Sequence, residues 1–102
     1  MRREEAGLSG GDWKDMFHAA LRGDTELVGF HLDSGIDVDH SHPEYLETVL
    51  VAAILARQEE MAHFLLDRGA DPHLISVMDA LTPLQAARQV GLASVVARLA
   101  PT

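Results

Sequence analysis

The residues best suited to chemistry lie in one short stretch, "DVDHSH", from Asp37 to His42. Two carboxylates alternate there with two imidazoles, and these groups together bind zinc and other divalent metals. If loops of neighbouring segments stack, a histidine from a later loop approaches the same place. One hypothesis is therefore a metal-binding protein; the alternative, which we favour, is a polar loop whose side chains are solvated or bond the backbone. The candidate ligands are Asp37, Asp39, His40, His42 and His73.

Sequence motifs typical of catalysis are missing. The chain has no Gly-rich phosphate loop, no nucleophile elbow and no His-Glu-x-x-His helix. The acidic pair Glu59–Glu60 lies at a predicted helix start, where carboxylates complement the helix dipole. The absence of cysteine excludes disulfides and thiolate chemistry. We therefore predict a protein that is not an enzyme and needs no cofactor.

The elements that position these residues belong to a unit that recurs along the chain. Gly35 falls on Gly69, 34 residues later, and glycine, aspartate, threonine and apolar positions agree in the same register. Repetition at a fixed period indicates stacked structural units that bury their apolar faces against one another. Further pairs in this register are Ala19 with Ala53, Leu27 with Met61, Phe30 with Phe64, Thr48 with Thr82, and Leu50 with Leu84.

Each unit has the pattern helix, short turn, helix, glycine stop, loop. Thr82 followed by Pro83 is a typical helix start, and Asp12 and Asp24 are expected to cap the two helices of the first unit. The apolar run 49–56, "VLVAAILA", would also suit a buried strand. We predict a helix there, because the run aligns with the helical pattern of residues 83–90.

The segments "TPLQAARQVG" and "LLDRGADPH" resemble the ankyrin repeat. They match its Thr-Pro-Leu-His opening and its Leu-Leu-x-x-Gly-Ala-Asp ending. The resemblance implies an all-α solenoid of about three helix-turn-helix units with projecting loops, called fingers. We expect a flexible tail over residues 1–11 and a single domain over residues 12–102, with repeats at about 12–45, 46–79 and 80–102.

The chain departs from the family pattern at four positions. Arg57 occupies the place of the glycine between helices, and Val49 that of proline. Leu46 and Ala80 replace the finger glycine, and each loop is one residue longer than the usual 33-residue period allows. We therefore expect distorted fingers, with an extra helical turn at "PEYLE" as one possible form.

By the same resemblance, the concave face of finger tips and inner helices binds a protein partner. Trp13 and Tyr45 are the first candidates, because aromatic residues are common among interface hot spots. Structural alternatives remain: Trp13 covers the first unit's core, Tyr45 packs under its own finger, and Met78 and Leu81 compensate for the missing glycine. The full set is Trp13, Arg22, Glu44, Tyr45, Glu47, Leu55, Met78, Asp79, Leu81 and Gln89.

The charge of the chain indicates which partners suit it. Sixteen acidic and eight basic residues give a net charge of −8, which argues against nucleic acid and anionic membranes. We expect a protein partner with a basic surface, and one form of this hypothesis is a small inhibitor or immunity-type protein. The longest apolar run is too short to span a bilayer, and no signal peptide is visible, so we expect a cytoplasmic monomer or weak homo-oligomer.

Overall fold

The computed structural model describes residues 10–101. The predicted tail lies outside these residues up to Ser9, while Gly10 and Gly11 already belong to the first helix. Asp12, predicted to cap that helix, therefore lies in its first turn. Within the described residues the chain forms α2 (Gly10–Leu21), α3 (Thr25–Asp33), α4 (Val49–Leu55), α5 (Glu59–Asp67), α6 (Pro83–Val90) and α7 (Ala93–Leu99).

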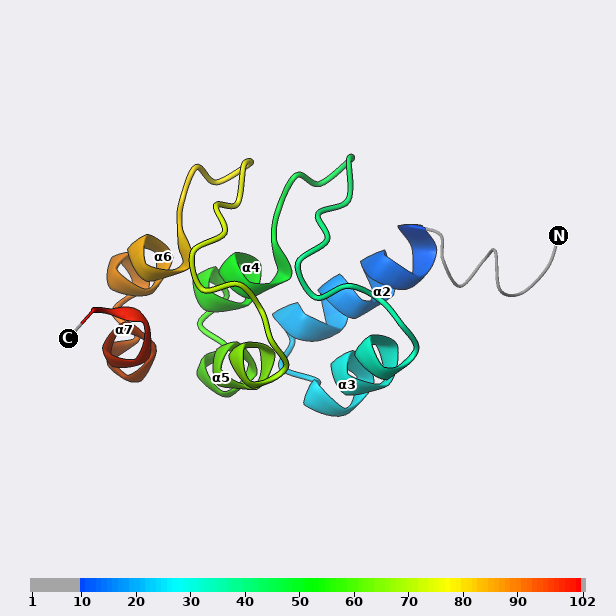
Figure 1. The fold of residues 1–102 in the computed structure, drawn as a ribbon, viewed down its shortest axis with the longest axis horizontal. Coiled ribbons are helices and arrows are strands. Elements are labelled where there is room, and N and C mark those ends of the chain that lie inside the picture. Colours follow the sequence, from blue (N-terminus) through cyan, green and yellow to red (C-terminus); the bar gives the residue numbers. More distant parts are fainter. Residues whose placement is uncertain (1–9, 102) are drawn as a thin grey trace, which may run out of the picture.

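The helices form three consecutive pairs that stack side by side (Figure 1). One row contains α2, α4 and α6, and the other contains α3, α5 and α7. Two long loops project beyond the first row; we call residues 35–48 finger 1 and residues 69–82 finger 2. Across residues 10–101 the β-type pairing is confined to one isolated bridge, between Ser76 and Leu81. The predicted all-α repeat solenoid is confirmed.

The 34-residue repeat is present in the backbone conformation as well as in the sequence. All residues with positive φ in the described part of the chain fall into three series spaced by 34 residues. The turn between paired helices places Gly23, Arg57 and Gly91 in this conformation, with φ of 80°, 62° and 74°. The helix ends before the fingers use Gly35 and Gly69, and the finger bases use Leu46 and Ala80, both with φ of 57°. Leu46, Arg57 and Ala80 therefore adopt a backbone conformation that glycine favours.

Helix starts follow local capping chemistry. The side chain of Thr48 accepts a hydrogen bond from the Val51 N–H, and Asp24 accepts one from Leu27. Thr82 forms a complete capping box with Gln85, and Pro83 occupies the first helical position. These side chains satisfy backbone donors that a helix leaves unpaired at its first turn.

The centre of the core is α4, which packs against both α2 and α6. Its residues from Val49 to Ile54 are all buried, including Ala53 with no exposed surface. A helix covered on both sides by neighbouring units buries its whole circumference, which explains why "VLVAAILA" is apolar throughout. The prediction of a helix rather than a strand over this run is confirmed.

The two fingers are joined by hydrogen bonds from backbone N–H groups. The Met78 N–H donates to the Leu46 carbonyl at 2.8 Å, and the Thr48 N–H donates to the Ser76 hydroxyl at 3.2 Å. Each finger closes with the same tight turn, from the Leu46 N–H to His42 and from the Ala80 N–H to Ser76. The extra turn expected at "PEYLE" is present as a hydrogen-bonded turn, in which the N–H groups of Tyr45 and Leu46 donate to the His42 carbonyl.

Candidate interaction surface

Finger 1 packs onto α2 through aromatic side chains. Trp13 stacks on Phe17 with ring centroids 4.8 Å apart, and Tyr45 meets both rings edge-on at 5.3 and 5.1 Å. The Trp13 indole N–H donates to the His40 carbonyl at 2.9 Å. Trp13 is only 2 % exposed, so it covers the first unit's core and offers no surface to a partner. Tyr45 is partly buried against the same core.

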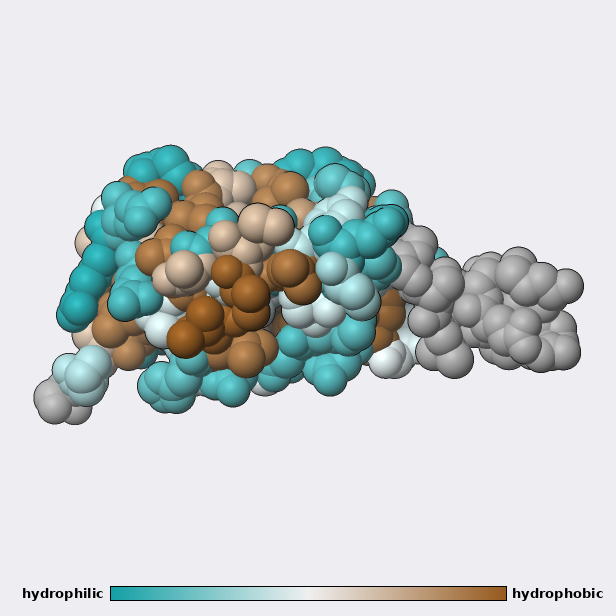
Figure 2. All heavy atoms as spheres, turned by 90° about the horizontal axis from the view of Figure 1, so that it is seen from above, coloured by the Kyte–Doolittle hydropathy of each residue, from teal (hydrophilic) through white to brown (hydrophobic). Residues whose placement is uncertain are grey.

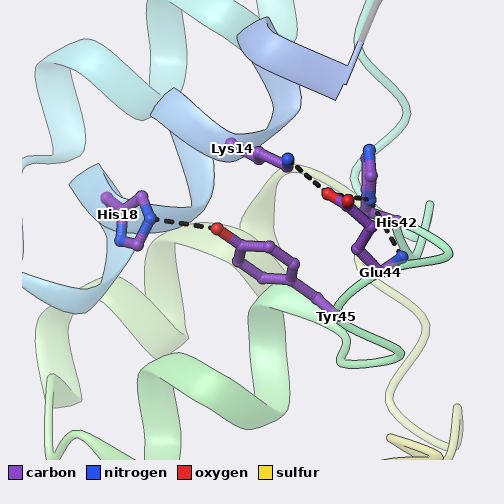
Figure 3. Close-up of polar contacts among 5 residues, drawn as sticks. All are labelled: Lys14, His18, His42, Glu44 and Tyr45. Atoms are coloured by element: carbon purple, nitrogen blue, oxygen red, sulfur yellow. Dashed lines mark hydrogen bonds and ion pairs between the residues drawn. The ribbon is translucent and has the colours of Figure 1, made fainter.

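Polar contacts hold the same finger from outside (Figure 3). Lys14 forms an ion pair with Glu44, and the Tyr45 hydroxyl lies 3.3 Å from His18 Nε2. The hydrogen bond from the Lys14 ammonium, helped by its charge, lowers the pKa of the Glu44 carboxyl. The tip of finger 1 is therefore engaged within the molecule, and Glu44 already has a cationic partner.

The acidic groups of "DVDHSH" organise loops instead of gathering around one point. Asp37 Oδ1 accepts from the Asp39 N–H, and Asp39 Oδ1 accepts from the Asp71 N–H of the next finger, both at 2.9 Å. Asp71 repeats the first contact with the His73 N–H at 2.9 Å. Across residues 10–101 no three His, Cys, Asp or Glu side chains are arranged to hold a metal ion. The metal hypothesis for Asp37, Asp39, His40, His42 and His73 thus has no support from the geometry.

A serine–histidine contact joins α5 and α7. Arg98 Nη1 lies 3.2 Å from His63 Nδ1, and His63 Nε2 lies 2.9 Å from the Ser94 hydroxyl. The Ser94 hydroxyl in turn donates to Glu59. Since a guanidinium only donates, His63 accepts from Arg98 and donates to Ser94. A histidine with this polarity does not take a proton from Ser94, so the contact joins repeats and does not activate a nucleophile.

Two acidic side chains meet between the fingers. Glu47 of finger 1 lies close enough to Asp79 of finger 2 for the two carboxyl groups to influence each other, and the Ser76 hydroxyl donates to Asp79 at 2.8 Å. Burial raises the pKa of the Glu47 carboxyl, and the neighbouring Asp79 carboxylate raises it further. We call Glu47 and Asp79 the acidic pair.

Large apolar side chains are exposed beside this pair. Val77 is 66 % exposed, Met78 58 %, Ile75 52 % and Leu46 41 %. We call these four residues the finger patch. Figure 2 looks down on the finger tips and shows hydrophobic atoms gathered in the middle of this face, with hydrophilic atoms around them. Such a patch with a polar rim is typical of a protein-binding site.

A fifth exposed large apolar residue, Phe30, lies on α3, in the row of helices that contains α3, α5 and α7. Its side chain is 63 % exposed and borders a shallow, open depression of about 470 Å³ between α3 and α5. Phe64 forms one wall, and the Arg68 guanidinium lies over its ring, 5.8 Å from the centroid. Arg68 Nη2 also lies 2.5 Å from Asp33 Oδ1. The ion pair between these two lining residues therefore occupies part of the depression.

The other predicted partner-binding residues are scattered over the surface. Arg22 is exposed directly after α2, and its Nη2 lies 3.9 Å from Asp24 Oδ2. Gln89 is exposed on α6. Leu55 and Leu81 are partly buried and pack against the core. Of the ten predicted residues, the structure brings Glu47, Met78 and Asp79 together at the fingers.

The sequence prediction did not include three members of the finger patch. Leu46 was noted only as a departure from the family pattern, while Ile75 and Val77 were not singled out. A signal was present, because residues 74–78 form a mostly apolar run within a segment predicted to be a loop. Loops are normally polar and exposed, so an apolar run inside one indicates a contact surface.

Comparison with known proteins identifies similar sequences. A family model described as "Ankyrin repeats (many copies)" matches residues 16–66, half of the chain. The chain is also similar to an L-asparaginase of Dirofilaria immitis, 38% identical over 80 residues that make up 78% of this chain. It spans only 13% of that relative's length. No solved structure matches. Among the described residues, no helix has both the length and the apolar character needed to cross a membrane.

Proposed function

The chain belongs to the ankyrin repeat family, whose repeats generally bind protein partners and are typically not enzymes, and we propose that it binds its partner through the finger patch. The observation that carries this proposal is the exposure of Leu46, Ile75, Val77 and Met78 on neighbouring fingers. Burying apolar surface is the main driving force of most protein association. The patch therefore offers the free energy that a binding site needs.

The fingers are also suited to binding because their backbone is already ordered. The bonds from Met78 to Leu46 and from Thr48 to Ser76 join the two fingers, and the Ser76–Leu81 bridge closes the second one. A surface held in its binding geometry loses little conformational entropy when the partner arrives. Exposed apolar side chains on a fixed backbone favour a specific partner.

The partner proposed here carries a basic surface. The chain has a net charge of −8, and complementary charge accelerates association more than it increases affinity. An acidic module that covers a basic partner can act as an inhibitor, the specific form that the charge suggests. In that case the association rate falls as salt is added, because ions screen the attraction over about 10 Å at 0.1 M.

The activity of the L-asparaginase relative is not proposed for this chain. The match covers 13% of that protein, and the serine–histidine contact described above has the wrong polarity for a nucleophile. The function proposed for this chain is instead the binding of a partner protein.

Capture from a lysate of the source organism tests the proposal. Immobilised wild-type chain is compared with a Val77→Ser/Met78→Ser variant and with Phe30→Ser, which removes an exposed apolar side chain outside the patch. We expect one or a few proteins to bind wild type and Phe30→Ser equally and to be lost from the double variant. Equal capture by all three chains would contradict binding through the finger patch.

A further inference from the structure

The finger patch and the acidic pair form one continuous feature. Glu47 directly follows Leu46, and Asp79 directly follows Met78. The hydrogen bond from the Met78 N–H to the Leu46 carbonyl places these two dipeptides side by side. Whatever covers the apolar residues therefore also lies against the two carboxyl groups.

The acidic pair is an unfavourable arrangement in the free protein at neutral pH. The Met78–Leu46 hydrogen bond sets the two dipeptides side by side, so ionised carboxylates at Glu47 and Asp79 bring like charges near each other. The Ser76 hydroxyl donates to Asp79 and relieves one of the two groups. An added cation would satisfy both.

Among residues 10–101, none of the ion pairs includes Glu47 or Asp79. Lys14, which contacts finger 1, already forms an ion pair with Glu44. In the described part of the chain the other ion pairs formed by arginine involve Asp24, Asp33 and Asp67. A positive group from a partner therefore complements two carboxyl groups that none of these ion pairs uses.

Building on the proposed function, we propose that the partner is a protein segment with a lysine or arginine beside a large apolar residue. The cationic group lies against Glu47 and Asp79, while the apolar side chain covers Ile75, Val77 and Met78. The apolar contact provides most of the affinity, and the charge contact selects the partner, since a segment with an acidic residue at that place meets two carboxylates.

Selection from a displayed library of random heptapeptides tests this inference with the full chain as bait. We expect wild type to enrich peptides in which Lys or Arg adjoins Leu, Ile, Val, Phe or Met. Glu47→Gln/Asp79→Asn should retain apolar peptides but lose the basic preference. Ile75→Ser/Val77→Ser should enrich neither class. Glu26→Gln/Glu60→Gln, with the same change in charge on exposed helix positions, should behave as wild type.

A synthetic peptide from the wild-type selection then gives the affinity by calorimetry. We expect Glu47→Gln/Asp79→Asn to weaken binding about tenfold, and the matched control to leave it unchanged. Circular dichroism of every variant establishes that it is folded. If the pair variant keeps both the basic preference and the affinity, or wild type enriches peptides without basic residues, the inference about the cation is wrong while the finger patch remains a binding site.

Two further outcomes also overturn the inference. One is enrichment of no peptide by folded wild type, which leaves the capture experiment as the separate measure of the proposed function. The other is a dimer in sedimentation that forms with increasing concentration and is abolished by Ile75→Ser/Val77→Ser. The patch would then be covered by a second copy of this chain, which has no need of a basic segment.

Discussion

At the scale of single residues, the fold imposes a left-handed backbone on side chains that resist it. Leu46 and Ala80 have φ of 57°, as glycine readily would. The conformation costs a residue with a Cβ about 1–2 kcal/mol. Its recurrence at the same place in both fingers indicates that the turn is set by the stacking of the fingers rather than by local preference.

Ala80→Gly should therefore stabilise the protein. We expect the free energy of unfolding in urea to rise by about 0.5–1 kcal/mol, since relief of the strained φ outweighs the added freedom of the unfolded chain.

Gly69→Val tests the same effect in the opposite direction at another position. Gly69 has a φ of 96°, and nothing lies within 4 Å of an added Cβ. The substitution should destabilise the protein by about 1 kcal/mol or more through the backbone alone. Equal stability of both variants and wild type would contradict the assigned turn geometry.

Two glutamates of finger 1 should respond to pH in opposite ways. The pKa of Glu47 is raised above 4.5, so its stabilising neutral form is present in full below that pH and is lost as pH rises through the folded-state pKa. Glu47→Gln keeps a neutral side chain, and we expect it to stabilise the protein at pH 7 by about 0.2–1 kcal/mol, the scale of exposed charge interactions. The gain should vanish near pH 4 in thermal melts.

Glu44→Gln serves as the matched control for this prediction. The pKa of Glu44 is lowered from 4.5 by Lys14, so its charge stabilises the fold at neutral pH and this contribution is lost as pH falls through the folded-state pKa. We expect a lower melting temperature than wild type at pH 7. Shifts of the same sign for the two variants would contradict the arrangement of finger 1.

At the scale of elements, α4 determines how closely the units stack. Its alanine at position 53 has no exposed surface, and small side chains at such contacts let neighbouring helices approach. Larger side chains in a filled core displace their neighbours. The spacing of the solenoid thus depends on a few alanines.

Ala53→Leu should destabilise the protein by about 1–3 kcal/mol through overpacking, as measured by urea unfolding. Ala97→Leu adds the same atoms at an exposed position of α7. We expect it to change stability by less than about 0.5 kcal/mol. A neutral Ala53→Leu would mean that α4 has more space around it than the structure gives it.

Elements were predictable from the sequence where local chemistry repeats. Thr48 and Thr82 mark helix starts, and Gly35 and Gly69 mark helix ends, so the register followed from residue types. The interaction surface was less predictable, because residue type alone does not distinguish a buried aromatic from an exposed one. Trp13 is a common hot-spot residue, yet here it fills the space under finger 1. Exposure depends on tertiary packing, which no local pattern records.

At the scale of the whole molecule, the main contacts join neighbouring helices. The central helix α4 packs on α2, α5 and α6, whereas α7, at one end of the stack, packs mainly on α5 and α6. In such a linear stack stability is a sum of unit and interface contributions, and terminal units open first.

Hydrogen exchange should reveal this gradient. We expect backbone amides of residues 52–54 in α4 to exchange roughly tenfold or more slowly than those of residues 97–99 in α7, as resolved by NMR. Binding of the captured partner or of a selected peptide at the fingers should slow amide exchange in both α4 and α7. Uniform protection across the two helices would indicate a fully cooperative domain instead of a linear stack.

The position of the single tryptophan gives the protein an optical reporter of its own. Trp13 lies under finger 1 with its indole N–H on the His40 carbonyl and the His42 ring 5.7 Å away. Indole fluorescence responds to the polarity and contacts of the ring. Displacement of finger 1 by a bound partner would therefore change the emission wavelength and intensity of Trp13. Finger motion can thus be followed in unlabelled protein, with no other tryptophan to contribute background.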